Sequence, residues 1–98
     1  MRKSVITLLS SLLIFGCASA PIQEMSDARQ AINAARQVMG ASTSAALRED
    51  FQRAETLLED AETQLRAGEY SKARRYAEEA KLLAIEARER AGEAGDFD

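Results

Sequence analysis

The 98-residue chain has no histidine and no tryptophan, one cysteine and one proline. A zinc site usually needs several histidine or cysteine ligands, and the chain has no histidine and only one cysteine. An internal disulfide needs two cysteines, so it is excluded as well. The commonest general acid or base is missing as well. With one proline and five glycines, long stretches are free of helix-breaking residues. These absences predict no metal, no cofactor and no enzyme activity, and they favour helices.

Basic residues are also in the minority. Lysine and arginine number 13 against 16 acidic residues, for a net charge of -3. A nucleic-acid partner needs a clustered basic face, so none is expected. The acidic group Glu59, Asp60 and Glu62 offers no pair of carboxylates isolated in an apolar pocket, which acid–base catalysis would need.

The N-terminus has the pattern of an export signal. Arg2 and Lys3 precede a mostly apolar run over residues 5–15. This run is too short for a bilayer core, which needs about 20 residues. A basic start, an apolar run and then small residues are typical of a secretory signal, the alternative being a buried N-terminal helix. We predict that residues 1–16 are a cleaved signal peptide.

The run ends in Ile14-Phe15-Gly16-Cys17, which resembles a bacterial lipobox. In that family the cysteine thiol receives a diacylglycerol, the chain is cut before the cysteine, and the new amine is acylated. Phe15 departs from the small residue usual at its position. The resemblance implies that Cys17 is lipidated and that residues 17–23 form a tether to the membrane.

A competing cleavage site follows at once. Ala18-Ser19-Ala20 resembles the A-x-A site of ordinary secretion. Cutting there would place Pro21 directly after the scissile bond, where its tertiary amide and fixed φ make a poor substrate.

The remaining chain predicts three helices, at residues 24–39, 45–67 and 70–91, because apolar residues recur at spacings of three and four. Gly40, Gly68 and Gly92 are predicted to stop them, and Ser44 to cap the second. Residues 92–98 are expected to be a disordered acidic tail. The predicted core positions are Met25, Ala28, Ile32, Ala35 and Met39, then Leu47, Phe51, Ala54, Leu58, Ala61 and Leu65, and finally Tyr70, Ala73, Ala77, Ala80, Ala84 and Ala87, with Tyr76, Leu82 and Leu83 widening the last face.

The phase of the pattern separates a hairpin from one long coiled coil. Continuing the second stripe past Leu65 reaches residues unsuited to a buried seam: Gly68, Lys72, Arg75 and Glu79. The third stripe starts in a new register at Tyr70. We therefore predict an all-α fold in which a turn at Gly68-Glu69 joins antiparallel helices.

Opposite charges four residues apart are expected to pair along each helix on solvated faces, each pair contributing about 0.2–0.5 kcal/mol. The five predicted pairs are Glu49–Arg53, Glu62–Arg66, Arg74–Glu78, Arg75–Glu79 and Glu86–Arg90.

Two resemblances follow from these helices. Residues 68–73, with Ala77 and Ala80, resemble the turn and second helix of a tetratricopeptide repeat. A single unit cannot form a solenoid, because stacked neighbours bury its faces, so this resemblance implies only a helical hairpin.

Residues 14–90 are more closely similar to a bacterial domain family of unknown function. The similarity lies in the lipobox, the string over residues 26–31, and the strings Ala67 to Tyr70 and Ala73 to Ala80. Members are short Ala-rich envelope lipoproteins, some fused to a peptidoglycan-binding domain like that of outer membrane protein A. The sequence leaves no room for such a domain before Asp98, so we do not expect wall binding to carry over from the resemblance.

The major murein lipoprotein is a second comparison, because it too is short, helical, Ala-rich and lipidated. It ends in the lysine that joins peptidoglycan, whereas this chain ends in Asp96-Phe97-Asp98. We therefore expect no covalent peptidoglycan link.

Together these patterns predict a lipid-anchored helical protein of the bacterial cell envelope that acts as an interaction or structural module, with a protein partner or self-association. An aspartate directly after the lipidated cysteine resembles an inner-membrane retention signal, and this chain has Ala18 and Ser19 there instead. We therefore expect the protein to be anchored in the outer membrane, facing the periplasm. One alternative is a pilotin-like or assembly-factor role, holding a helix of a larger envelope protein. Another is a membrane-active lipoprotein, which the acidic polar faces disfavour.

Overall fold

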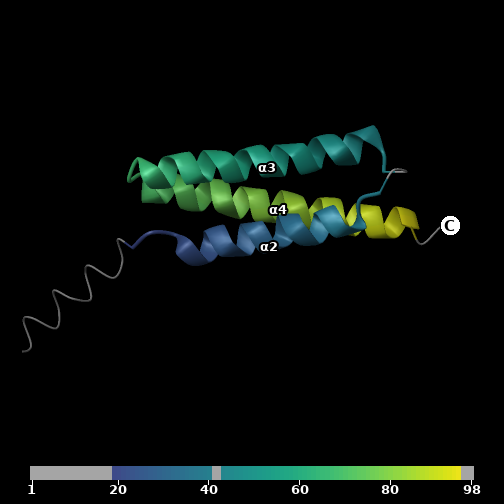
Figure 1. Ribbon diagram of the computed structural model, residues 1–98, viewed down its shortest axis with the longest axis horizontal. Coiled ribbons are helices and arrows are strands. Elements are labelled where there is room, and N and C mark those ends of the chain that lie inside the picture. The colour runs from purple at the N-terminus through teal and green to yellow at the C-terminus, as the bar shows by residue number, and fades with distance from the viewer. Residues whose placement is uncertain (1–18, 41–42, 96–98) are drawn as a thin grey trace, which may run out of the picture.

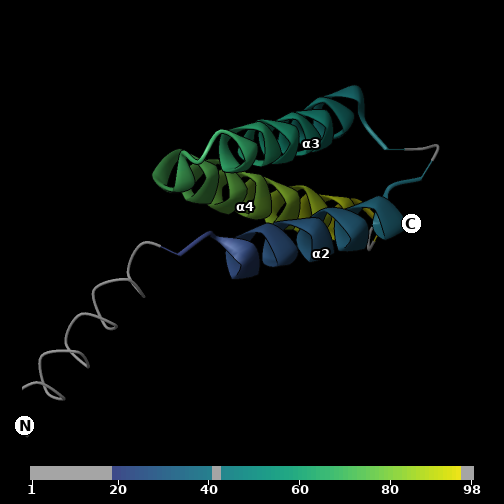
Figure 2. The same ribbon diagram turned by 60° about the vertical axis from the view of Figure 1, so that its left-hand side comes forward.

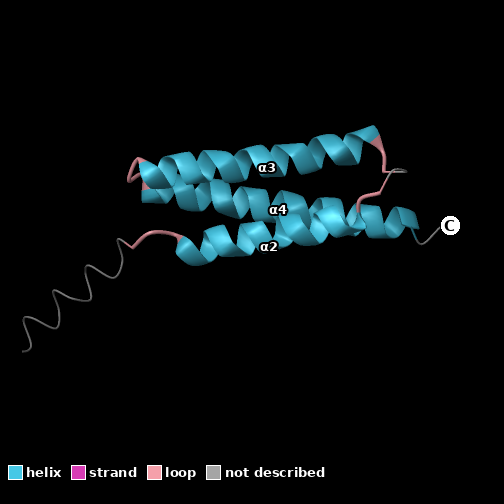
Figure 3. Cartoon of the chain, in the orientation of Figure 1, coloured by secondary structure: helices cyan, strands magenta, loops and turns pink. Residues whose placement is uncertain are grey.

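The computed structural model describes residues 19–40 and 43–95, and in them the chain is all-α (Figures 1 and 3). Helix α2 spans Ile22–Val38, α3 spans Ala45–Arg66 and α4 spans Tyr70–Gly95. Helices α2 and α4 run in the same direction and α3 runs opposite to both (Figure 1). Helix α4 packs extensively on each of the others, whereas α2 and α3 meet less closely. The predicted all-α, three-helix arrangement is confirmed.

Helix α2 begins two residues earlier than expected, so part of the predicted tether is helical. Pro21 is its N-cap residue, and the carbonyl of Pro21 accepts the first helical hydrogen bond from the Met25 amide at 3.0 Å. Proline suits a helix start, because it has no N–H to leave unpaired and its φ is already fixed. Pro21 is also fully buried, so the chain is packed against the bundle from this residue onward.

Residues on either side of the connection from α2 to α3 are described up to Gly40 and from Thr43. Gly40 is predicted to stop the first helix directly after Met39, but α2 already ends at Val38, with Met39 extended at φ -88°. The Gly40 amide donates instead to Thr43 Oγ1 at 2.9 Å. Ser44 caps α3 as predicted, its hydroxyl accepting from the Leu47 amide at 3.3 Å.

The turn between α3 and α4 is closed by a glycine. Gly68 has φ +80°, the left-handed conformation that favours glycine. Its amide donates to the Leu65 carbonyl at 3.0 Å, and the Glu69 amide donates to the Gln64 carbonyl at 2.9 Å. These two bonds form a Schellman motif, which satisfies carbonyls at the end of α3. The hairpin prediction is thus confirmed over the continuous coiled coil.

Helix α4 is longer than predicted. Gly92 lies inside it, and the helix continues to Gly95. A glycine ends a helix when it takes a left-handed φ, and among the described glycines only Gly68 does so. The predicted disordered tail is therefore wrong for residues 92–95, and residues 96–98 lie outside the described part of the chain.

Alanine dominates the core. Nine of the twelve buried apolar residues in the described ranges are alanines, and every buried residue of α4 is one: Ala73, Ala77, Ala80, Ala84 and Ala87. Such a seam lets helices approach closely while burying little area per residue. Two clusters form along it, around Met25 near the start of α2 and around Ile32 further along. Leu58 of α3 packs against both and joins them.

Two predicted core positions of α4 are wrong. Leu82 is 65% exposed, because it lies about 200° around the helix axis from Ala80, on the opposite face. Tyr70 is 39% exposed, because it is the first residue of α4, at the end of the bundle.

Within the described ranges, no helix is both long and apolar enough to cross a membrane.

Candidate functional site

The predicted modification site lies outside the described residues. Ile14, Phe15, Gly16 and Cys17 all precede Ser19, where the described part begins. The signal peptide and the lipidation of Cys17 therefore remain predictions. What the structure does place is the segment just after the cysteine, together with the surfaces of the three helices.

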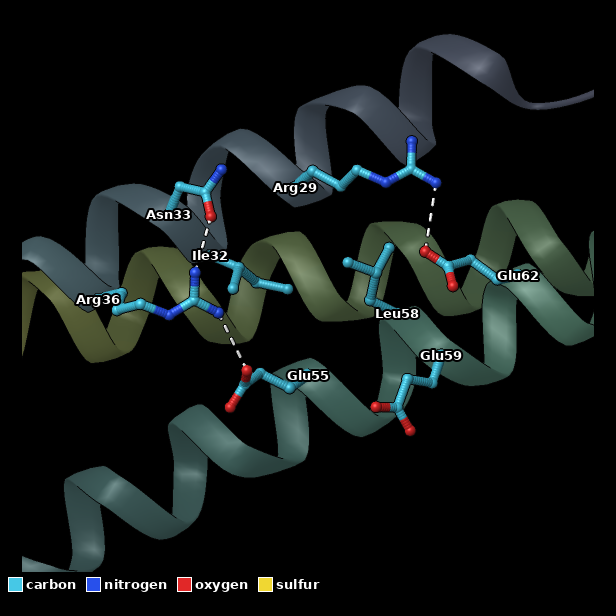
Figure 4. Close-up of a pocket in the computed structure, with 8 residues that line it drawn as sticks. All are labelled: Arg29, Ile32, Asn33, Arg36, Glu55, Leu58, Glu59 and Glu62. Atoms are coloured by element: carbon cyan, nitrogen blue, oxygen red, sulfur yellow. Dashed lines mark hydrogen bonds and ion pairs between the residues drawn. The ribbon is translucent and has the colours of Figure 1, made fainter.

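A shallow groove of about 340 Å³ runs between α2 and α3 (Figure 4). Ile32 and Leu58 line it with apolar surface, and charged side chains border it from both helices. Arg29 Nη2 lies 3.2 Å from Glu62 Oε1, and Arg36 Nη2 lies 3.0 Å from Glu55 Oε2. In Figure 4 both arginines reach from α2 across the groove toward α3.

Two further features of this groove concern Arg36 and Glu59. Arg36 also donates to Asn33 Oδ1 at 2.9 Å and lies 5.6 Å from the centre of the Phe51 ring. Of the carboxylates that line the groove, that of Glu59 has no polar partner within the described ranges. The groove therefore carries both signs of charge, and the ion pairs Arg29–Glu62 and Arg36–Glu55 span it.

The opposite side of α2 carries acids that face α4. Glu24 Oε1 lies 3.3 Å from Arg74 Nε, and Asp27 Oδ2 lies 4.0 Å from Lys81 Nζ. Helix α2 therefore presents acids to the basic side chains of α4 and arginines to the acids of α3. Each pair is partly exposed, so each contributes only about 0.2–1 kcal/mol, but together they specify where α2 sits.

This pattern corrects the expected charge pairing within helices. Of the five predicted i,i+4 pairs, the described residues form only Glu86–Arg90. Glu62 and Arg74 instead pair with α2, and Arg90 also reaches Asp50 of α3 at 3.2 Å. Spacing along one helix identifies possible neighbours on that helix, and it carries no information about partners on another.

No chemistry can be assigned from buried groups. In the part of the chain that the structure describes, no polar or charged side chain is buried. The same ranges contain no group of three or more side chains that could hold a metal ion. The absence of catalysis stays a prediction, since it concerns a function that these observations do not test.

Comparison with known proteins places the chain in a family. The family model described as domain of unknown function DUF4398 matches residues 23–95. The chain belongs to the DUF4398 family. The DUF4398 match covers almost all of α2 and the whole of α3 and α4. No curated protein and no solved structure matches the chain. Membership in a domain family of unknown function is therefore confirmed, whereas its lipoprotein character remains a prediction.

One contact next to the predicted tether was not predicted from the sequence. Ser19, assigned to a loose tether, has its carbonyl bonded by Arg74 Nη2 at 3.3 Å. Arg74 holds Glu24 of α2 at the same time, so one guanidinium fastens both the start of α2 and the segment before it. The sequence carried no signal for this contact, because the burial of Pro21, which also ties this segment to the bundle, is visible only in the structure.

Proposed function

We propose that this DUF4398 protein is a lipid-anchored, non-catalytic module of the bacterial cell envelope. Acyl chains on Cys17 would hold it to a membrane, and its three-helix bundle would present charged helix faces to protein partners or to further copies. The observation that carries the proposal is the sequence Ile14-Phe15-Gly16-Cys17 after a basic and apolar N-terminus, directly before a folded helical domain.

The physical chemistry of the anchor supports a stable attachment. A buried acyl chain contributes about 0.8 kcal/mol for each CH₂, and two membrane signals are enough for stable anchoring. A diacylglycerol on the Cys17 thiol and an acyl chain on its amine would exceed that requirement. Within the described ranges no helix can cross a membrane. In this proposal the acyl chains on Cys17 attach the protein to the membrane.

The contacts at Ser19 favour cleavage before Cys17 over cleavage after Ala20. Cleavage before Cys17 retains the Ser19 carbonyl, which accepts a hydrogen bond from Arg74. Cleavage after Ala20 would remove that acceptor and would leave the buried Pro21 as the new N-terminus. The lipoprotein site therefore fits the packing of the bundle better than the ordinary secretion site.

A pilotin-like role, in which the α3–α4 hairpin holds a partner helix, has less support. Helix α2 already packs on that hairpin, with Met25 in one core cluster with Ala61 of α3 and Ala77 of α4. The remaining groove lies between α2 and α3. The groove there holds about 340 Å³ and is spanned by the pairs Arg29–Glu62 and Arg36–Glu55. An α-helix with its side chains is about 10 Å across, so it would have to break both pairs and separate α2 from α3. The outward faces of the helices are accessible without such a rearrangement.

The substitution Cys17→Ser tests the anchor in cells. Serine lacks the thiol that receives the diacylglycerol, so we expect loss of labelling by a fatty-acid probe and accumulation of the unprocessed precursor. The wild-type protein should be labelled and recovered with outer-membrane fractions. Ala18→Ser, which changes the residue beside the cysteine and keeps the thiol, is the matched control and should be labelled normally.

Normal labelling of the Cys17→Ser protein would contradict lipidation. Recovery of labelled wild-type protein only with inner membranes would leave the anchor intact and contradict the proposed location.

A further inference from the structure

The end of the bundle that carries the α3–α4 turn has a charge opposite to that of the chain as a whole. Residues 66–75 contain one acidic side chain, Glu69, and four basic ones: Arg66, Lys72, Arg74 and Arg75. The net charge of the whole chain is -3. We call residues 19–24 and 66–76 the turn end, since the start of α2 and the α3–α4 turn lie at the same end of the bundle (Figures 1 and 2). The turn end has the same four basic side chains and two acidic ones, Glu24 and Glu69.

Most of this positive charge is available to a partner. Arg66, Lys72 and Arg75 are exposed, and within the described ranges none of them forms an ion pair. The guanidinium of Arg75 lies 5.5 Å from the centre of the Tyr76 ring, and Arg75 remains exposed beside that ring. Apolar side chains accompany them, because Ile22 is 65% exposed and Tyr70 is 39% exposed.

One of these charges stands where the helix itself disfavours it. Lys72 is in the first turn of α4, which contains no acidic residue. The N-terminal end of a helix carries partial positive charge and favours acids, so a lysine there opposes the stability of the fold. The local electrostatics of α4 therefore do not account for a lysine at this position.

The turn end also lies next to the predicted anchor. Ser19 follows Cys17 by two residues, which span at most about 7 Å of extended chain. The Ser19 carbonyl is bonded to Arg74 of α4, and Pro21 is buried against the bundle. If acyl chains on Cys17 enter a bilayer, these contacts bring the turn end to the headgroups.

We propose that the turn end is a docking surface for the anionic phosphate headgroups of the anchoring membrane, and that the bundle projects away from it. The basic residues contact phosphates, while Ile22 and Tyr70 reach the apolar boundary below them. Helix α4 has 26 residues, so its far end lies about 39 Å from the surface. This proposal rests on the proposed lipidation of Cys17.

Fluorescence quenching in vesicles tests this orientation with the full mature protein. Lipidation blocks Cys17, so a cysteine introduced by Ala67→Cys or by Glu93→Cys is the only free thiol for an environment-sensitive fluorophore. Both positions are exposed. In phosphatidylglycerol–phosphatidylcholine vesicles with a headgroup quencher, we expect strong quenching at position 67 and little at position 93. In 1 M salt, where the Debye length falls to about 3 Å, quenching at position 67 should decrease.

Charge reversal separates headgroup contact from simple tethering. Each basic side chain near an anionic surface favours contact by about fivefold, so Arg66→Glu with Lys72→Glu should shift docking by at least about 25-fold. Glutamate at position 72 suits the start of α4, whereas glutamate at position 66 stands in the last turn of α3, where the helix favours a basic residue. The melting temperature of the double variant is therefore measured beside its quenching, and the single variant Lys72→Glu, which should shift docking by at least about fivefold, carries the test if the double variant is destabilised. Reversal of Arg53 and Arg88, which lie away from the turn end, is the matched control and should leave quenching unchanged.

The outcomes separate this proposal from the anchor. Lipidated protein with equal quenching at positions 67 and 93, or with quenching that the Arg66 and Lys72 reversals leave intact, overturns the docking surface alone. Protein whose mass shows no lipid overturns the proposed function, and this docking surface with it.

Discussion

The described glycines illustrate how backbone conformation, rather than residue type, determines the effect of a side chain. Gly68 has a φ of +80°, whereas Gly40 lies in the loop after α2 and Gly92 lies inside α4, both without positive φ. A Cβ added at any of the three would have no atom within 4 Å. Steric crowding is therefore equal at the three sites, and only the backbone distinguishes them.

This difference predicts opposite effects for one substitution at two sites. Gly68→Ala places a Cβ on a left-handed residue and should destabilise the fold by about 1 kcal/mol. Gly92→Ala removes a glycine from a helix and should stabilise it by up to about 1 kcal/mol. In thermal unfolding of the soluble chain from Ala18, about 1 kcal/mol corresponds to a shift of roughly 4–8 °C. A higher melting temperature for Gly68→Ala would contradict the hairpin turn.

The glycines also show what the sequence could predict at this scale. The turn at Gly68 was predictable because the apolar pattern changes register there, which adds a second signal to the glycine. No such change accompanies Gly92, and a glycine alone is compatible with a helix interior. Gly40 lies close to a true helix end, but Met39 takes the extended conformation that ends α2.

At the scale of elements, α4 organises the bundle through its alanines. Ala80 is fully buried and belongs to the cluster that joins α4 to Met25 of α2 and Ala61 of α3. The small side chains allow both neighbours to approach α4. Their spacing predicted this face from the sequence, because five alanines recur three and four residues apart. The partners of α2 across the bundle were not predictable, since they depend on how the helices are arranged.

The alanine seam predicts that larger side chains are harmful. Ala80→Leu adds three carbons where no space is available and should destabilise the fold by about 1–3 kcal/mol. Leu82→Ala, two residues away on the exposed face, is the control and should change stability by at most about 0.5 kcal/mol. Urea unfolding of both variants measures the difference. An Ala80→Leu variant as stable as the wild type would show that α2 and α3 do not close on α4 at this seam.

At the scale of the whole molecule, the described bundle begins two residues after Cys17, the proposed lipidation site. Arg74 connects α4 to the segment before α2, because it bonds both Ser19 and Glu24. The fold class and the hairpin were predictable from periodicity, whereas this connection was not, since Ser19 shows no periodic signal. If Cys17 carries lipid, the bundle would lie directly at the membrane surface, because the chain is packed against the bundle at Pro21 and leaves no free linker after it.

The mass of the mature N-terminus, measured on protein purified from cell envelopes, tests this central claim most directly. The account predicts a chain that begins at Cys17 and carries a diacylglycerol and an amide-linked acyl chain. An unmodified chain that begins at Pro21 would contradict it, because cleavage after Ala20 would then be the true processing step and no anchor would remain.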